Sequence, residues 1–219
     1  MYRVILFDLD DTLYPRSSAL MPSIARRIEQ YVTERVGIPQ ERADELRSRW
    51  RTIYGTSLRG LIEEGYEFDI DDYLCYVHDV PLDGLIETQP GVRRMLLDMP
   101  LRRAVLTNSD AQHATRVLSH LNLLDCFERI VDIRALNFLN KPDPRAYQRA
   151  LQIMNATAEE TILVEDTPVN TKPAKELGIK TILVDHPYTD DADYCVSSLI
   201  MVGSVVNQIL ATGAKGTQN

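Results

Sequence analysis

Three aspartates follow directly on a short apolar run near the start of the chain. Residues 4–7 are apolar, and Asp8, Asp10 and Asp11 come after them. In extended backbone, side chains two residues apart point to the same side, so we expect Asp8 and Asp10 to face one another and Asp11 to point away and cap a turn. Two facing carboxylates resist joint ionisation and require a cation or a shared proton. Such a carboxylate can be a nucleophile, a metal ligand or a general acid.

A second acidic pair, Glu165 and Asp166, follows the apolar run 162–164. If both pairs lie at one edge of a sheet, four carboxylates gather there, and only a cation stabilises them together. Oxygen ligands suit Mg²⁺, and no histidine cluster with metal-ligand spacing favours zinc. We therefore expect a Mg²⁺ site. No role is predicted for the histidines, which are His78, His113, His120 and His186.

Donors for an anion occur at two further places. Thr107 and Asn108 follow the apolar run 104–106, with a helix expected from about Asp110; a hydroxyl beside a helix N-terminus can bind a phosphate, although the same residues also make a good cap. Lys141 lies on a loop just before a helix that Pro144 is suited to begin. There it can place a positive charge against a phosphate and the acids.

The spacing of apolar runs indicates how these side chains are positioned. Runs at 4–7, 104–106, 130–133, 162–164 and 182–184 alternate with amphipathic helical patterns, which is typical of buried parallel strands in βαβ units. We expect an α/β fold with a doubly wound, Rossmann-like parallel sheet. In such sheets ligands bind at the carboxyl ends of the strands. The residues expected just past these ends are Asp8, Asp10, Asp11, Thr107, Asn108, Lys141, Glu165 and Asp166.

The stretch 16–87 has a helical pattern throughout, with Leu20, Ile24, Ile28 and Tyr31 on one face. We interpret it as a helical cap domain inserted after the first strand. The catalytic core would then consist of residues 1–15 and 88–219. Closing over the site, the cap would select the substrate and exclude water. Its candidate contact residues are Arg16, Ser17, Tyr54 and Arg59.

Four segments resemble, in order, the four motifs of the haloacid dehalogenase-like phosphohydrolase superfamily. They are FDLDDTLY at 7–14, LTN at 106–108, KPDP at 141–144 and VEDTPVN at 164–170. The resemblance covers nearly the whole chain, because the helical stretch occupies the place of that superfamily's cap. It implies a phosphatase that acts on a small soluble phosphate ester and requires Mg²⁺.

The resemblance also implies a role for each matching residue. Asp8 would be the nucleophile that forms an aspartyl-phosphate, and Asp10 would protonate the leaving oxygen and later activate water. Thr107, Asn108 and Lys141 would bind the phosphate.

The metal would be held by Asp8, the backbone carbonyl of Asp10, and Asp166. Glu165 and Asn170 stand where many relatives have other residues, so we treat them as supporting residues.

The residues of the first motif favour one class of reaction and leave several substrates as alternatives. True dehalogenases of this superfamily lack the acid at the position of Asp10, which therefore favours phosphate esters. The string from Asp8 to Tyr14 is similar to the branch containing pyrimidine 5′-nucleotidases, while phosphoglycolate phosphatases, sugar phosphatases and sugar phosphomutases remain alternatives. A phospho-accepting signalling module is a remote alternative, because receiver domains order their motifs differently and lack a cap. A catalytically silent binding protein would be expected to lack at least one of the four residues that carry the chemistry. All four, Asp8, Asp10, Lys141 and Asp166, are present.

Composition limits the partners and the compartment. The chain has 219 residues and a net charge of -8 without a basic block, so nucleic acid is not an expected partner. Its three cysteines are widely spaced, which favours a reducing cytoplasm over a disulfide framework. No run is long enough to cross a membrane. We expect a cytoplasmic monomer or homodimer whose partner is a small molecule.

Overall fold

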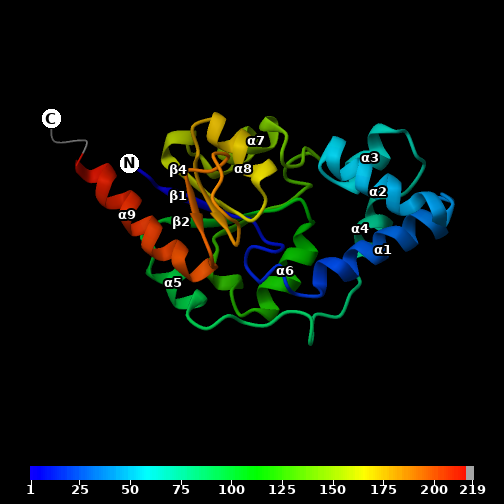
Figure 1. Ribbon diagram of the computed structural model, residues 1–219, viewed down its shortest axis with the longest axis horizontal. Coiled ribbons are helices and arrows are strands. Elements are labelled where there is room, and N and C mark those ends of the chain that lie inside the picture. The colour runs from blue at the N-terminus through cyan, green and yellow to red at the C-terminus, as the bar shows by residue number, and fades with distance from the viewer. Residues whose placement is uncertain (216–219) are drawn as a thin grey trace.

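The computed structural model describes residues 1–215 and contains a parallel sheet (Figure 1). The strand order is β3-β2-β1-β4-β5-β6, and every neighbouring pair is parallel. This arrangement confirms the predicted α/β, doubly wound, Rossmann-like fold. The strands are β1 (Val4–Phe7), β2 (Arg102–Leu106), β3 (Arg129–Val131), β4 (Thr161–Glu165), β5 (Lys180–Val184) and β6 (Tyr194–Val196).

Helices connect the strands and cover both faces of the sheet (Figure 1). Three short 3₁₀ turns, Leu124–Cys126, Ala158–Glu160 and Leu199–Met201, complete the connections. The α-helices are α1 (Leu20–Glu34), α2 (Gln40–Tyr54), α3 (Ser57–Glu63), α4 (Ile70–His78), α5 (Val92–Asp98), α6 (Ala111–His120), α7 (Pro144–Met154), α8 (Pro168–Glu176) and α9 (Val202–Lys215).

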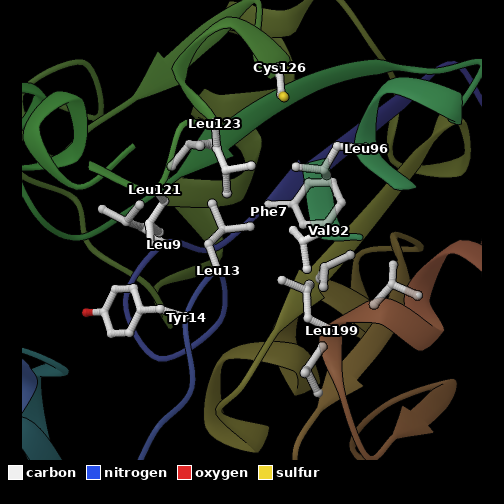
Figure 2. Packing of buried hydrophobic residues seen from close by; sticks show 14 of the residues in the cluster. Phe7, Leu9, Leu13, Tyr14, Val92, Leu96, Leu121, Leu123, Cys126 and Leu199 are labelled. Carbon is white, nitrogen blue, oxygen red and sulfur yellow. The ribbon is translucent and has the colours of Figure 1, made fainter. Parts of the chain in front are cut away.

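The alternation of β1 explains the two hydrophobic layers. Ile5 and Phe7 point to the cluster formed with α5, α6 and α9, whereas Val4 and Leu6 point to the cluster formed with α7 and α8. Figure 2 shows Phe7 inside the first layer, together with residues of the loop after β1. Since β1 is buried on both faces, the loop that carries the aspartates starts from a fixed point.

Helices α1–α4 gather at one end of the molecule, on the right of Figure 1, and pack around their own cluster, which includes Trp50 and Tyr73. We call this cluster around Trp50 and Tyr73 the insertion cluster. It is not wholly separate from the sheet layer, because α1 contributes Leu20 to the sheet layer and Tyr31 to the insertion cluster. The returning segment already packs in the sheet layer at Val80. The division into residues 16–87 and a core of 1–15 and 88–219 stays a prediction, and residues 216–219 lie outside the described part of the chain.

Several local predictions agree with the structure and two strands differ. Asp110 caps α6 by accepting from the His113 amide, and Pro144 begins α7. The predicted run 130–133 is shifted, since β3 ends at Val131. Strand β6 was not predicted, because it has only three residues at the sheet edge and two of them are half-buried, which leaves no apolar run.

Within residues 1–215, none of the helices combines the length and the apolar character needed to span a bilayer.

Candidate active site

The acidic segments meet where β1 and β4 lie side by side. Phe7 is in register with Val164, and the Asp8 amide donates to the Val164 carbonyl at 2.9 Å. Asp8 therefore follows β1 at the same edge at which Glu165 and Asp166 follow β4. The strand order reverses between these two strands, which is the position where open parallel sheets bind ligands.

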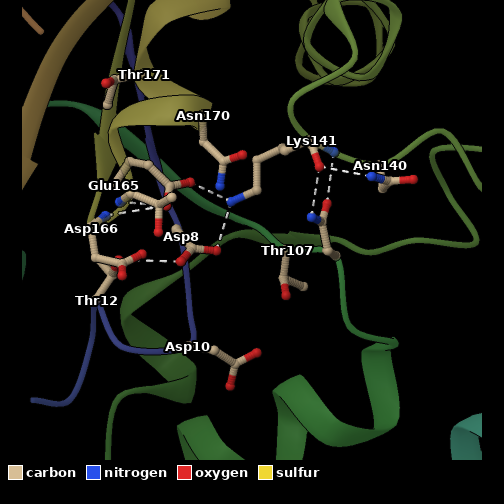
Figure 3. A network of polar contacts seen from close by, with 12 residues as sticks. Asp8, Asp10, Thr12, Thr107, Asn140, Lys141, Glu165, Asp166, Asn170 and Thr171 are labelled. Atoms are coloured by element: carbon tan, nitrogen blue, oxygen red, sulfur yellow. Dashed lines mark hydrogen bonds and ion pairs between the residues drawn. The ribbon is translucent and has the colours of Figure 1, made fainter. Parts of the chain in front are cut away.

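Lys141 lies between the two acidic segments (Figure 3). Its Nζ is 2.7 Å from Asp8 Oδ1 and 2.7 Å from Glu165 Oε2, and its side chain is 1% exposed. Burial alone would lower the pKa of Lys141, but the carboxylates of Asp8 and Glu165 raise it, so the amine is charged. A charged amine fixed against Asp8 is the arrangement that an incoming phosphate would meet.

Three carboxylates form a group that could hold a metal ion. Asp8, Glu165 and Asp166 each offer an oxygen, and these oxygens lie within 4.8 Å of one another. Burial, followed by the neighbouring charge of Glu165, raises the pKa of Asp8 to about 7, and burial also raises the pKa of Glu165 to about 7. The pKa of Asp166 is raised by burial and then by Asp8. The raised pKa values mean that the negative charge of the three carboxylates is not fully balanced by the positive charge around them. A bound divalent cation would supply the missing positive charge.

Glu165 is more fully engaged than the other two carboxylates. Oε2 accepts from Lys141, and Oε1 accepts from the backbone amides of Asp166 and Thr167 at 3.2 and 3.3 Å. Its side chain is fully buried. Glu165 therefore holds Lys141 in place, and its supporting role stays a prediction.

Arg16 also contacts the acidic group. One guanidinium nitrogen donates to Asp166 Oδ2 at 2.7 Å and to the Asp166 carbonyl at 2.6 Å. The sequence indicated Arg16 only as a candidate contact of the cap with substrate. In the structure its guanidinium forms an ion pair with Asp166, which is a predicted metal ligand.

The Asp10 carboxylate is held by three donors. Its Oδ1 accepts from Tyr14 at 2.7 Å and from His113 Nε2 at 3.0 Å, and its Oδ2 accepts from Ser109 at 2.9 Å. Burial alone would raise the pKa of Asp10, but His113, Tyr14 and Ser109 together lower it, so the resting side chain is a carboxylate. Its carboxylate is not a member of the group of three around Asp166. The expectation for metal binding concerned its backbone carbonyl, and it stays a prediction.

This contact involves a histidine, for which the sequence predicted no role. His113 lies far from Asp10 in sequence, in helix α6, and their side chains meet only because β1 and β2 are neighbours in the sheet. Histidine spacing could not reveal it, because the partner is an aspartate rather than another histidine. The apolar stripe of 111–120 would have placed His113 on the buried face, next to Ala114 and Val117.

The two residues after β2 have different environments. The Asn108 side chain accepts from the Lys141 amide at 2.8 Å and donates to the Lys141 carbonyl at 3.0 Å, so it fixes the loop that carries the lysine. Thr107 is buried, and its hydroxyl accepts from the Ser109 amide at 3.0 Å. Both residues line the cavity over the site. Their contacts with a phosphate stay predictions.

A cavity of about 630 Å³ lies over these residues, between the sheet edge and helices α1–α4. Its floor includes Asp8, Lys141 and Asn170, and its opposite wall is largely apolar, with Ile24 and Val77 among the lining residues. Figure 3 shows Asn170 beside Lys141, on the helix that follows β4. The predicted supporting residue thus lies in the site.

The other expected cap contacts are placed elsewhere. Tyr54 and Arg59 line a smaller cavity together with Asn140 and Pro142, and Ser17 is exposed and lines neither cavity. Asp11 has a left-handed backbone with a φ of 63°. Its Oδ1 is buried and has no hydrogen-bond partner within residues 1–215, so that oxygen does not cap a turn.

Comparisons with known proteins agree with this geometry. The family described as haloacid dehalogenase-like hydrolase matches residues 5–184. The chain is 24% identical over 195 residues to phosphate metabolism protein 8 of Saccharomyces cerevisiae, a match covering 83% of this chain and 61%, less than two thirds, of that protein. It is 26% identical over 205 residues to the glyceraldehyde 3-phosphate phosphatase of Pyrococcus abyssi, covering 83% of this chain and 81% of that protein.

Among solved structures, the L-2-haloacid dehalogenase from Xanthobacter autotrophicus superposes with a TM-score of 0.62 at 16% identity. The superposition covers 95% of this chain and 99% of that one. At this identity the likeness concerns the fold alone.

Proposed function

Because the chain belongs to the haloacid dehalogenase-like hydrolase family, we propose that it is a Mg²⁺-dependent phosphomonoesterase that works through an aspartyl-phosphate on Asp8. The phosphatases among its relatives support a phosphatase activity on a small phosphate ester. The requirement for Mg²⁺, the covalent step and the choice of substrate are argued from the residues of the site.

One observation carries the covalent step: Asp8 is buried at the strand end, with its Oδ1 fixed by Lys141 at 2.7 Å. Thr12 donates to the other oxygen, Oδ2, at 3.2 Å. A carboxylate oriented in this way at the floor of a cavity presents its oxygens to a phosphorus atom without first losing many waters. The same lysine can neutralise the phosphoryl oxygens during transfer.

The donor set fits Mg²⁺, which prefers hard oxygen ligands. Since Glu165 is occupied by Lys141 and by backbone amides, Asp8 and Asp166 would hold the ion, together with the Asp10 carbonyl that the family resemblance implies. When bound, the ion neutralises negative charge on the phosphoryl group and on the carboxylates. Arg16 would have to leave the Asp166 carboxylate, which frees its guanidinium for the substrate.

In this mechanism Asp8 is the nucleophile and Asp10 makes both proton transfers. An Asp8 oxygen attacks phosphorus and the ester P–O bond breaks, while Asp10 gives its proton to the leaving oxygen. Because resting Asp10 is a carboxylate, it first takes up this proton from solvent, when the negative charge of the incoming phosphate raises its pKa. Afterwards Asp10, now a carboxylate, takes a proton from the water that attacks the aspartyl-phosphate, and Asp8 is released.

The cavity supports a substrate larger than phosphate itself. Its 630 Å³ and its apolar wall suit a flat or apolar group attached to the phosphate, while Arg16 and Arg51 on its lining suit further polar groups. We propose a pyrimidine nucleoside 5′-monophosphate as the substrate. Phosphoglycolate, sugar phosphates and a mutase reaction on a sugar phosphate are the alternatives.

A hydrolysis panel with matched variants tests the proposal. Wild-type protein should release phosphate from an aryl phosphate with Mg²⁺, lose the activity after chelation, and regain it when Mg²⁺ returns. Asp8→Asn should have no activity with an unchanged circular dichroism spectrum. Retained activity in Asp8→Asn, or full turnover without metal, would refute the mechanism. Comparing kcat/KM across nucleotides, phosphoglycolate and sugar phosphates ranks the substrates, and accumulation of free phosphate excludes the mutase.

A further inference from the structure

His113 is a buried imidazole whose polar contact is with Asp10. Its side chain is 1% exposed, Nε2 lies 3.0 Å from Asp10 Oδ1, and Nδ1 has no hydrogen-bond partner among the described residues. An ionised carboxylate only accepts hydrogen bonds, so Nε2 is the donor. Burying a polar ring costs free energy, and an apolar side chain would fill the same space without that cost. The contact with Asp10 is therefore what the imidazole contributes at this position.

The ring of His113 is held from its other side by His78. The two imidazoles stack with their centroids 4.3 Å apart and their planes 20° from parallel. His78 ends helix α4, and it is attached to α6 by Arg116, which donates to the carbonyls of His78 at 2.7 Å and Val80 at 2.8 Å. His113 and Arg116 are three residues apart and lie on one face of α6. Consequently the ring cannot rotate away from Asp10 without breaking the stack.

The other two donors to Asp10 are less constraining. Tyr14 and Ser109 donate through hydroxyl groups, whose hydrogens rotate to suit the acceptor. A stacked imidazole in a helix has one direction for its N–H. Moreover, Ser109 uses one lone pair of Oδ2, so this oxygen keeps another for a proton exchanged with substrate or water.

We propose that His113 is the positioning residue for Asp10: its fixed Nε2–H holds the carboxyl so that Oδ2 faces the leaving oxygen. The inference rests on the proposed role of Asp10 as general acid and base. His113 itself is not among the residues that line the cavity over the site. Its loss would leave Asp8, Lys141 and the acidic group intact while allowing Asp10 to turn.

This role has a kinetic signature that a structural role lacks. A poor leaving group, such as an alkyl alcohol, needs a proton from Asp10, whereas 2,4-dinitrophenolate leaves without one. Misplacing Asp10 therefore lowers kcat/KM for alkyl phosphates and spares kcat/KM for dinitrophenyl phosphate. Because both values come from one preparation, the fraction of folded enzyme cancels in their ratio.

The experiment compares this ratio in wild type, His113→Leu and His113→Gln. We expect His113→Leu to lower the alkyl-to-dinitrophenyl ratio by about 10- to 100-fold, the size of effect that a small misplacement of a catalytic group produces. In His113→Gln the side-chain amide nitrogen can reach the place of Nε2, and we expect the ratio to return to within a few-fold of wild type. If His113→Leu is inactive with both substrates, His113→Asn, whose amide is too short for that reach, replaces it.

Two further variants separate the outcomes. His120→Gln lies in the same helix, where His120 contacts the Ile86 carbonyl, and should leave the ratio unchanged. Asp10→Asn should lower the ratio at least as much as His113→Leu. An unchanged ratio in both Asp10→Asn and His113→Leu would remove Asp10 as the acid and with it the proposed mechanism. A lowered ratio in Asp10→Asn with an unchanged ratio in His113→Leu or His113→Asn would overturn the positioning role alone.

Discussion

Lys141 determines both the stability and the chemistry of the site at the scale of single residues. It is the cation between Asp8 and Glu165, all three are at least nine-tenths buried, and its loop is fixed by Asn108. Removing one member of a buried ionic group leaves uncompensated charge, and that costs more than the group contributed when complete.

We expect Lys141→Met to lower the free energy of unfolding by about 3 to 5 kcal/mol without metal, and to lower kcat/KM by at least about 100-fold because the phosphoryl charge loses its partner. Urea unfolding and steady-state kinetics measure the two effects. Adding Glu165→Gln should restore part of the stability and none of the activity, because it removes one of the uncompensated charges.

Lys180→Met provides the control, since Lys180 pairs with Asp193 and its side chain is 33% exposed. Such a pair is worth less than about 1 kcal/mol. Equal losses from Lys141→Met and Lys180→Met would contradict the buried arrangement.

Single residues also mark how far the sequence alone could lead. Asp8 and Asp166 directly follow strands that apolar runs identify, so their convergence was predictable from the sheet. Lys141 lies on the loop before α7 and contacts Asp8. The contacts of His113 with Asp10 and of Arg16 with Asp166 were not predictable. They depend on rotamers and on how the loop after β1 turns back, and local spacing carries no information about either.

At the scale of elements, α2 ends where the insertion meets the Lys141 loop. Gly55 has a φ of +83°, and a Cβ there would lie 2.6 Å from Asn140 Nδ2 and 2.7 Å from the Lys141 carbonyl oxygen. Asn140 also donates to the Tyr54 carbonyl at 2.8 Å. This close approach holds the helices over the site.

We expect Gly55→Ala to lower kcat/KM by about 10- to 100-fold, because it pushes the Lys141 loop out of place. Gly37→Ala is the matched control, since Gly37 has a φ of +82° and no atom of the described part of the chain lies within 4 Å of its Cβ position. Both variants carry a left-handed strain of about 1 to 2 kcal/mol, so thermal unfolding should move in both. Equal activity in the two variants would argue against the contact.

The segment before β6 is attached to β5 through Asp193. Its Oδ2 accepts from the Thr181 amide at 2.8 Å and from the Thr181 hydroxyl at 2.9 Å, and its Oδ1 accepts from Lys180 at 3.0 Å. Burial alone would raise the pKa of Asp193, but these donors lower it. A carboxyl whose pKa is lower in the folded than in the unfolded state stabilises the fold above its unfolded pKa, and this contribution is lost as the pH falls through the folded pKa.

Asp193→Asn should therefore lower the free energy of unfolding by about 1 to 2 kcal/mol at pH 7. The difference from wild type should shrink below about pH 4, where the aspartate of the unfolded wild-type chain becomes protonated. Urea unfolding at pH 7 and pH 3 measures it. A difference that grows toward pH 3 would contradict the assigned sign.

The elements differ in how well their patterns predict them. β1, β4 and β5 are continuous apolar runs because helices bury both of their faces, so the sequence locates them within one or two residues. β6 pairs on one side only and has a single buried residue. Its pairing with β5 makes it a strand, and no local pattern contains that information.

At the scale of the whole molecule, the sheet and the inserted helices share residues. α1 packs Leu20 and Ile24 into the sheet layer, and Ile133, just after β3, packs with the insertion cluster around Trp50. These shared contacts couple the sheet and helices α1–α4 energetically, although the outer ends of the two parts lie far apart in Figure 1.

We expect one cooperative unfolding transition. Trp50 is the single tryptophan of the chain and lies in the insertion cluster, so its fluorescence reports on α1–α4, while far-UV circular dichroism reports on all helices. The two midpoints in urea should coincide. A tryptophan transition at clearly lower urea would mean that the inserted helices unfold as a separate unit.

The central claim is that a phosphoryl group becomes bonded to Asp8, and Asp10→Asn makes that step observable. With 2,4-dinitrophenyl phosphate the variant needs no acid to form the aspartyl-phosphate, yet it lacks the base that hydrolyses it. Rapid mixing should give a burst of about one equivalent of dinitrophenolate per site, and mass spectrometry of the quenched protein should find the phosphoryl group on Asp8. Release of phosphate in step with dinitrophenolate from the first turnover, with Asp8 unmodified, would contradict the account.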